Sequence, residues 1–379
     1  MWISSTWVVV LLGCSARLEL GTDRDASVGP GTADGGPDAP ALADASDART
    51  DLTPLTGRMA CGEQFCCAVG AAGNVRCWGS NGYGQLGNGS KTDSDVPVEP
   101  LGLSSGATSV SARGQRACAV VNGAAYCWGH SAPTPSGVVG MGSGGASIAV
   151  GLEHVCALLT DGRAKCWGAN AYGQIGAGSI SNATEDPTLV TLPTAPKALA
   201  AGADHTCALF ASGRVSCWGA NTSGTLGNDQ HVLENDPAPT AVEVSSLEGV
   251  VGIGAARYTT CAINAASEVK CWGQTLGSPT KAIWSPLDIV ALVPGGIAHI
   301  CGITSSGALR CWGQNFGYGV FGDGTATGSG PSGPVELTVV AASGGARHTC
   351  AISTAGTAKC WGQMRGSTVV LTPTDVPGW

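Results

Sequence analysis

The chain has 379 residues, of which 59 are Gly and 17 are Cys, and only 12% are charged. That length suffices for one large repeat domain or two ordinary ones. The formal net charge of −8 excludes recruitment of nucleic acid or of an anionic membrane by charge. So many cysteines are typical of disulfides in an exported protein, because a reducing cytosol keeps thiols free.

The N-terminal residues predict export. Residues 7–12, WVVVLL, are apolar and too short to span a bilayer, and they lead into Leu-Gly-Cys at 12–14. This resembles a bacterial lipoprotein signal. The resemblance implies a signal peptide over 1–13, a lipid on Cys14, and a location in the bacterial cell envelope, at the outer membrane or the cell surface. A plain secretory signal or a misassigned start is the alternative, since no Lys or Arg precedes the apolar run.

The next stretch, 14–51, predicts a disordered tether. Ala, Asp, Gly and Pro dominate it, and large apolar residues are almost absent. Such a segment cannot bury enough surface to offset the entropy lost on ordering. We therefore expect the folded domain to occupy residues 52–379.

Within 52–379 one unit is copied seven times, at intervals of about 40 to 54 residues. Each copy contains a Cys-Trp-Gly triplet and an earlier Cys, joined by a short apolar run, a turn signal and a short mixed run. Gly recurs too often for helices of useful length, so each copy predicts a β-hairpin. The triplets begin at Cys77, Cys127, Cys166, Cys217, Cys271, Cys311 and Cys360.

Turn chemistry places the two cysteines of each copy opposite each other. In six copies they stand ten apart, which leaves a three-residue loop that favours Gly in its last position. Gly occupies that position in five of the six, and Ser267 is the exception. In the remaining copy the spacing is nine and the two-residue loop is Asn122-Gly123, the preferred type I′ sequence.

Directly opposed residues of antiparallel strands lie within reach of a disulfide. We expect seven bridges within hairpins, with fourteen buried free cysteines as the alternative; zinc is disfavoured by the missing short Cys-x-x-Cys spacing. Cys61 and Cys66 can form an eighth bridge, although Cys66 and Cys67 can exchange roles. The seven pairs are Cys67–Cys77, Cys118–Cys127, Cys156–Cys166, Cys207–Cys217, Cys261–Cys271, Cys301–Cys311 and Cys350–Cys360.

Seven hairpin-bearing repeats of about 45–50 residues predict an all-β fold, a seven-bladed β-propeller. The Trp that follows each Cys points to the opposite sheet face and is expected to pack against the next blade. Residues 52–67 align with the strand-like stretch that precedes other copies, and the chain ends soon after the last triplet. We therefore expect the N- and C-terminal strands to close the ring, the N-terminal strand completing the last blade.

Gly-x-x-His-Thr-Cys-Ala-Leu, Gly-x-Val-x-Cys-Trp-Gly and Asn-x-x-Gly-Gln-Leu-Gly resemble the repeat of the regulator of chromosome condensation family, over roughly 52–379. The resemblance implies a seven-bladed propeller and little about activity. The last element is intact in copies one and three, altered in copy four, one residue longer in copy six and missing from the others. The founding member's nucleotide-exchange activity is not transferred, because an acidic, lipid-anchored chain lacks its cytosolic partner and basic surfaces.

His154, His205, His299 and His348 share one repeat position, two before the first Cys. They could bind metal, but sites spread around a ring lie too far apart to share an ion, and bonding a neighbouring backbone group is the simpler role. We expect no metal and no cofactor. No Ser-His-Asp, Cys-His or paired-carboxylate set is indicated, so the protein is not expected to be an enzyme.

Binding is the expected activity, through propeller loops in which the copies differ. Trp284 lies in a variable loop and can anchor a partner or fill a gap between blades, and the Gly-rich loops carry Tyr83, Tyr172, Phe316 and Tyr318. We expect a monomer that touches the membrane only through Cys14 and binds an unknown surface protein. The alternatives are a structural envelope component, a carbohydrate-binding propeller, or an inhibitor of an extracellular enzyme.

Overall fold

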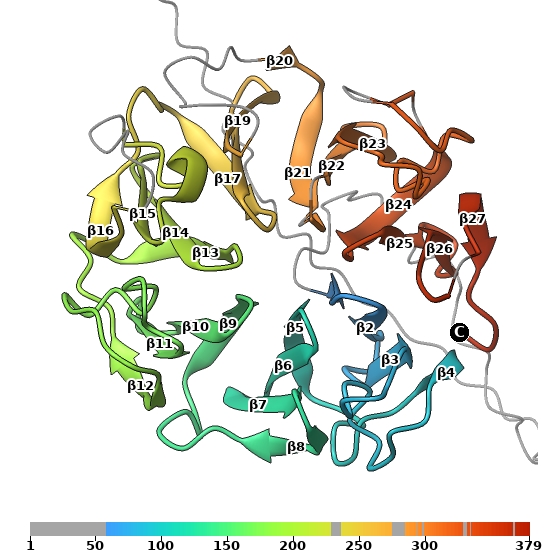
Figure 1. Ribbon diagram of the computed structural model, residues 1–379, viewed down its shortest axis with the longest axis horizontal. Helices are drawn as coiled ribbons and strands as arrows, with labels where there is room; N and C mark the ends of the chain where they lie inside the picture. The colour runs from blue at the N-terminus through green and yellow to red at the C-terminus, as the bar shows by residue number, and fades with distance from the viewer. Residues whose placement is uncertain are drawn as a thin grey trace, which may run out of the picture. The chain divides into compact units, whose positions relative to one another are not determined.

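The computed structural model describes residues 58–228, 236–274, 285–293, 295–297, 299–328, 332–333, 335–366 and 368–379. The expected signal peptide, Cys14, the tether over 14–51 and Trp284 lie outside these residues. Antiparallel strands dominate, as Figure 1 shows, and the one helical element among the described residues is the 3₁₀ turn η1 (Thr222–Gly224). None of the described helical structure is long and apolar enough to cross a membrane.

The first four blades are four-stranded antiparallel sheets made from consecutive strands. Each starts with an inner strand, continues through the cysteine hairpin and ends on an outer strand. Blade one holds β1 (Met59–Cys61), β2 (Phe65–Val69), β3 (Val75–Gly79) and β4 (Ser94–Val98), and blade two holds β5 (Ala107–Arg113), β6 (Arg116–Val121), β7 (Ala124–Gly129) and β8 (Ala132–Gly137). Blade three holds β9 (Gly145–Val150), β10 (His154–Leu159), β11 (Ala164–Gly168) and β12 (Thr184–Leu189), and blade four holds β13 (Pro196–Ala201), β14 (His205–Phe210), β15 (Val215–Gly219) and β16 (Ala238–Glu243).

The last three blades follow the same order, and one long strand serves two of them. Its first half pairs with β23 and its second half with β25, so it is the outer strand of blade six and the inner strand of blade seven. Blade five holds β17 (Val250–Ala255), β18 (Thr259–Asn264), β19 (Glu268–Gly273) and β20 (Ser285–Pro286). The remaining strands are β21 (Ile289–Val293), β22 (His299–Thr304), β23 (Ala308–Gly313), the shared β24 (Val335–Gly344), β25 (His348–Ser353), β26 (Ala358–Gly362) and β27 (Val370–Asp375).

The hairpins have the register that the cysteine spacing predicts. Cys156 faces Cys166 in the ten-residue copies, and Cys118 faces Cys127 in the nine-residue copy. The structure contains all seven hairpin bridges, and the eighth is Cys61–Cys66. The last loop residue has a positive φ in each ten-residue hairpin, which Gly adopts readily and which Ser267 (φ 60°) adopts at a cost.

The core is divided into seven apolar clusters, one between each pair of neighbouring blades. We call each of these interfaces a seam. The closing seam lies between blades seven and one, where Cys61 and Trp78 pack with Cys350 and Val376. Because every seam buries apolar side chains from two sheets, each blade is stabilised mainly by its neighbours.

Two expectations about blade contacts are wrong. The N-terminal strand does not complete the last blade: β1 pairs with β2, and β27 supplies the outer strand of blade seven. The reason is that residues 370–375 form a strand of their own after the last triplet.

The second wrong expectation concerns the tryptophans, which pack against the preceding blade, while the disulfides face the next one. Alternation along the strand separates the two sheet faces, but the order of blades around the ring decides which neighbour each face meets.

The Asn-x-x-Gly-Gln-Leu-Gly loops explain the position of the tryptophans. In blade one the side-chain oxygen of Asn81 accepts the backbone N–H of Leu86 (2.9 Å), which folds the loop over the seam. Gln85 of the same loop then accepts the indole N–H of Trp128 in blade two (2.9 Å). The other loops do the same for the next blade, pairing Trp218 with Gln174, Trp272 with Thr225 and Trp361 with Val320.

Candidate functional site

One face of the ring carries the turns that join each inner strand to the second strand. The third strand of each blade ends beside this turn. Backbone hydrogen bonds show this: the residue after the third strand donates its N–H to a carbonyl of the turn, in the pairs Ser80–Gln64, Ala169–Glu153 and Gln363–Arg347. The Gly-rich loops that follow the third strands therefore lie on the same face. We call it the mouth face, because the turns surround the end of the central channel, around which the blades are arranged in Figure 1.

The turns are bonded from blade to blade and enclose a cavity of about 210 Å³ at the centre of the mouth face. The backbone N–H of Leu152 donates to Ala203 (2.9 Å), and that of Ala203 donates to Arg257 (2.9 Å). Arg113, Arg257 and the exposed Glu63 are among the lining residues, and most of the others are Gly or Ala. The cavity is therefore a charged depression in a rigid backbone frame.

The side chain of Arg113 lies across the channel. It leaves the end of β5 in blade two, and its Nη2 donates to Ala201 in blade four (3.1 Å) and to Ala255 in blade five (3.0 Å). Arg113 lines both the mouth cavity and the channel of about 670 Å³ behind it, so it separates the two. Burial, followed by the positive charge of Arg257, lowers the pKa of Arg113 to about 10.

Both arginines have a side-chain N–H group without a hydrogen-bond acceptor. The buried Nε of Arg113 and that of Arg257 find no acceptor among the described residues. Two acids lie nearby. Glu63 lines the cavity, and the pKa of Asp204 is raised by burial against the lowering effect of Arg257. A buried N–H without an acceptor is costly, so the arrangement suits a ligand that brings acceptor oxygens into the cavity.

Sequence reasoning missed these arginines, although a signal was present. Arg113 occupies a repeat position that is Gly in most blades, including Gly151 and Gly202. A Cβ at Gly151 would lie 2.1 Å from the ring of His154, so a histidine blade requires Gly there. Blade two has Arg116 in the histidine position, which releases this constraint. Arg113 and Arg116 are thus two departures from the repeat in one copy, and such departures are the signal that could have identified these residues.

The predicted aromatic residues lie on the mouth face in equivalent loops. Tyr83, Tyr172 and Phe316 are each about half exposed, at 48%, 45% and 61%. Tyr318 is half-buried, with the guanidinium carbon of Arg347 4.6 Å from the centre of its ring. Three exposed aromatic side chains therefore lie in loops on the same face as the central cavity.

The repeated histidines are structural, with a partner different from the expected one. In three seams the ring Nε2 bonds a threonine hydroxyl of the next blade, where a backbone group was expected. These bonds join His154 to Thr206 (2.8 Å), His205 to Thr260 (2.9 Å) and His299 to Thr349 (3.2 Å). Burial is the largest cause that lowers their pKa values, to about 3 for His154 and His205 and to about 4 for His299.

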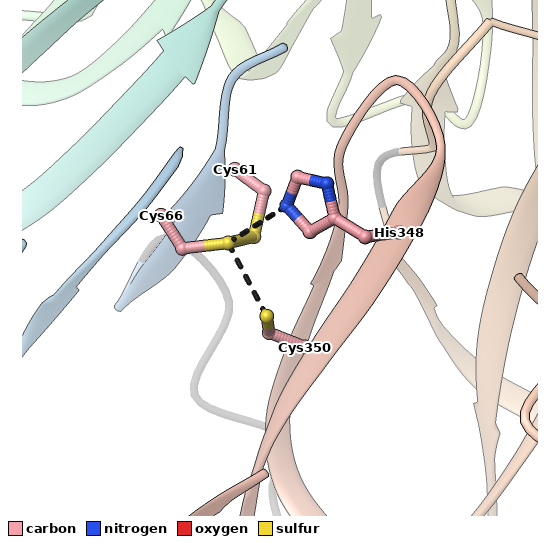
Figure 2. A group of neighbouring side chains, drawn as sticks. All are labelled: Cys61, Cys66, His348 and Cys350. Carbon is pink, nitrogen blue, oxygen red and sulfur yellow. Dashed lines mark hydrogen bonds between the residues drawn. A yellow bond between two sulfur atoms is a disulfide. The ribbon is translucent and has the colours of Figure 1, made fainter. Parts of the chain in front are cut away.

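The fourth histidine, His348, lies at the closing seam in a different setting. Its Nε2 is 3.2 Å from the Sγ of Cys66, which occupies the position of the threonines elsewhere. Figure 2 shows this ring with Cys61, Cys66 and Cys350, whose ligand atoms all lie within 4.8 Å of one another. These are the described residues that could hold a metal, but their sulfurs are bridged, and a metal binds the thiolate form.

These features define a class: the protein is a β-propeller whose charged central cavity and exposed aromatic loops share one face. Residues 72–120, 161–209 and 212–263 match the regulator of chromosome condensation (RCC1) repeat, as do residues 58–85, 146–174 and 197–225 under a second description of it. The chain therefore carries regulator of chromosome condensation repeats and folds into a propeller of that type.

Relatives and solved structures agree on the repeat and the fold. The Ultraviolet-B receptor UVR8 of Arabidopsis thaliana is 31% identical over 214 residues, covering 51% of this chain and 47% of the receptor, so the match spans about half of that relative. Human WBSCR16 superposes with a TM-score of 0.68 at 18% identity over 78% of this chain and 85% of its own. Yeast RCC1 (Prp20), solved bound to Kap60, gives 0.65 at 17% identity over 80% and 83%.

Proposed function

We propose that the protein is a non-enzymatic binding module that holds a protein partner on its mouth face. The main supporting observation is the central cavity, where the half-buried Arg113 and Arg257 each have a buried Nε–H that lacks an acceptor among the described residues. Propellers of this repeat type mediate protein binding, as the yeast relative bound to Kap60 illustrates. The exposed Tyr83, Tyr172 and Phe316 add the flat apolar area that protein interfaces favour.

The chemistry of the cavity indicates which group of the partner enters it. A carboxylate offers two acceptor oxygens to the arginine N–H groups and adds the negative charge that two positively charged guanidinium groups favour. We therefore propose that an acidic side chain of the partner enters the cavity while its surface rests on the aromatic loops. A neutral sugar would satisfy the same N–H groups less strongly, which places the carbohydrate-binding alternative second.

The proposal includes the location of the protein. A signal over 1–13, a lipid on Cys14 and a tether over 14–51 would hold the propeller at the bacterial cell surface. Eight disulfides support an oxidising compartment. Cys14→Ser should move the full chain from the membrane fraction to the soluble fraction; a variant that stays in the membrane would refute lipid anchoring through Cys14.

The experiment is a quantitative pull-down from envelope extract with the full chain. Arg257→Gln and the double change Tyr83→Ala/Tyr172→Ala test the centre and the edge of the mouth face, and Trp284→Ala tests the variable loop. The controls are Arg163→Gln, at a hairpin tip, and Val139→Ala, after β8, since both lie at the end of their blades remote from the mouth.

A protein that the wild type and both controls capture, and that the mouth variants lose, supports the proposal. Equal capture by every variant would exclude the mouth face as the binding site. Recovery of glycans in place of protein would favour the carbohydrate-binding propeller. Inhibition of a captured hydrolase would identify the partner as an extracellular enzyme. A structural envelope component with no specific ligand predicts that no protein depends on these residues.

A further inference from the structure

The closing seam contains a disulfide that the repeat does not explain. Cys61, at the end of β1, faces Cys66 on β2 and is bridged to it. In blade four the residues at these two positions are Ala201 and Thr206, directly paired in the same register. The bridge therefore replaces an Ala–Thr pair at the seam where the ring joins its two ends.

A second bridge lies against the first. The Sγ of Cys66 is 3.4 Å from the Sγ of Cys350, which is bridged to Cys360 within blade seven. Figure 2 shows the Cys61–Cys66 bridge pointing from blade one at Cys350 and at the ring of His348. The four side chains are buried, with exposed fractions of 4% or less. A thiolate formed at Cys66 would therefore lie in contact with a disulfide of the other blade.

We infer that the closing seam is a thiol–disulfide exchange site. An entering thiol converts two bridges within blades into one bridge between blades one and seven, Cys66–Cys350, and leaves a mixed disulfide at Cys61 and a free thiol at Cys360. The entering thiol that starts the exchange is a small molecule. Exchange needs only contact between the sulfurs, a thiolate and a path for the entering thiol.

The steps balance without an external oxidant or reductant. The thiolate of the entering thiol attacks the Sγ of Cys61, forming a mixed disulfide there and releasing the Cys66 thiolate. Cys66 then attacks the Sγ of Cys350, so the Cys350–Cys360 bond breaks and Cys66–Cys350 forms. Cys360 leaves as a thiolate and takes up the proton that the entering thiol lost. Two disulfides and one thiol become two disulfides and one thiol.

His348 is placed to assist Cys66. Burial lowers the pKa of His348 to about 3, so its ring is neutral near pH 7 and Nε2, 3.2 Å from the Sγ of Cys66, can accept an S–H hydrogen bond. In the ordinary seams the same nitrogen bonds a threonine hydroxyl, which no exchange can use. His348 is therefore a positioning residue for the Cys66 sulfur.

The mouth cavity provides the path. Cys61 is one of its lining residues, and so are Gly62 and Glu63 of the turn that the bridge spans. The entering thiol therefore approaches Cys61 from the mouth face, while Cys66 and Cys350 stay behind it within the seam. The product bridge would join blades that share no strand among the described residues, in which β1 pairs with β2 and β27 pairs with β26.

The test is disulfide mapping of the full chain after incubation in a glutathione buffer, quenched with a maleimide. Trypsin gives peptides 59–76, with Cys61, Cys66 and Cys67, and 348–359, with Cys350, while Cys360 is in 360–365. We expect 59–76 to become linked to 348–359, and 360–365 to be released carrying one maleimide. Peptide 198–214, with Cys207, should stay linked to 215–257 and serves as the internal control.

Three variants keep the test decisive. Cys61→Ser frees the Cys66 thiol, so the Cys66–Cys350 link should form without added glutathione. Cys61→Ala/Cys66→Thr installs the residues of blade four and should abolish the link while keeping the His348 contact. His348→Gln should slow the exchange in Cys61→Ser without changing which link forms. An intact Cys350–Cys360 bridge in Cys61→Ser, with Cys66 alkylated, would overturn the inference.

Discussion

The seam between blades four and five and the closing seam are built from the same repeat, yet they are held differently. In the first, His205 bonds Thr260 (2.9 Å), and the indole N–H of Trp272 donates to Thr225 (3.0 Å). Both bonds join neutral groups of complementary type in a buried interface, and each of the two bonds pairs a donor with an acceptor.

The closing seam lacks both partners. His348 faces the sulfur of Cys66, and the indole N–H of Trp78 has no acceptor among the described residues. The copy before it, in blade seven, does not contain the Asn-x-x-Gly-Gln-Leu-Gly loop, which in four other seams supplies the carbonyl that accepts the indole N–H. Trp379 packs edge-on against Trp78 instead, with ring centres 5.5 Å apart. The difference teaches that the loop, more than the hairpin, completes a seam.

The largest expected effect is on acid stability, and it tests whether the histidines of the two seams behave alike. Burial lowers the pKa of His205 and His348 to about 3, below the unfolded value of 6.5. The neutral rings therefore stabilise the fold above pH 6.5, and this contribution is lost as the pH falls toward 3. Each buried histidine should lower the free energy of unfolding by about 1.4 kcal/mol per pH unit below 6.5.

The measurement is urea unfolding between pH 7 and pH 4.5 with the disulfides intact. His205→Gln and His348→Gln should each reduce the pH slope by the equivalent of one proton, because burial acts on both rings. If only His205→Gln changed the slope, the sulfur contact of His348 would have to replace burial as the governing cause.

The second effect concerns the two tryptophans. Trp272→Phe removes an indole that donates to Thr225 and leaves that carbonyl without its donor, whereas Trp78→Phe removes an N–H that has no acceptor. We expect Trp272→Phe to lower the free energy of unfolding by about 1 kcal/mol more than Trp78→Phe. Parallel denaturant titrations of the two variants give this difference, and an equal loss would show that the loop carbonyl adds nothing to the seam.

The smallest expected effect is the loss of stability on breaking the ion pairs across the closing seam. Arg365 of blade seven contacts Asp93 (3.1 Å) and Asp95 of blade one, and all three side chains are partly or largely exposed. Arg365→Ala should cost less than about 1 kcal/mol, and the loss should shrink with added salt. Arg214→Ala breaks a pair within blade four and is the matched control. A salt-independent loss at Arg365 would show that packing holds this part of the seam.

The sequence predicted the hairpins because their chemistry is local. Loop length and turn residue change together at Asn122-Gly123, which fixes the cysteine register without knowledge of the rest of the fold. The ring closure was mispredicted because it depends on long-range pairing: a strand that can complete either the first or the last blade looks the same in sequence. For the same reason, alternation placed Cys and Trp on opposite faces without saying which neighbour each face meets.

The candidate site was harder to predict because it lies where the repeat fails. Arg113 can span the channel only because blade two has Arg116 in place of a histidine, and its carbonyl partners, Ala201 and Ala255, are supplied by blades four and five. Amino-acid composition does not predict that residues of blades two, four and five meet. Comparing the copies position by position identifies the exception, and only the ring shows that it faces the centre.

Each blade is one uninterrupted stretch of chain, apart from the single strand that blades six and seven share. The order of blades is therefore independent of where the polypeptide starts. A gene reopened in the link between β16 and β17, with residue 379 joined by a short linker to residue 58, should encode a circular permutant with the same ring. New blades could likewise be gained by duplicating a segment of about 50 residues, without rebuilding a composite sheet.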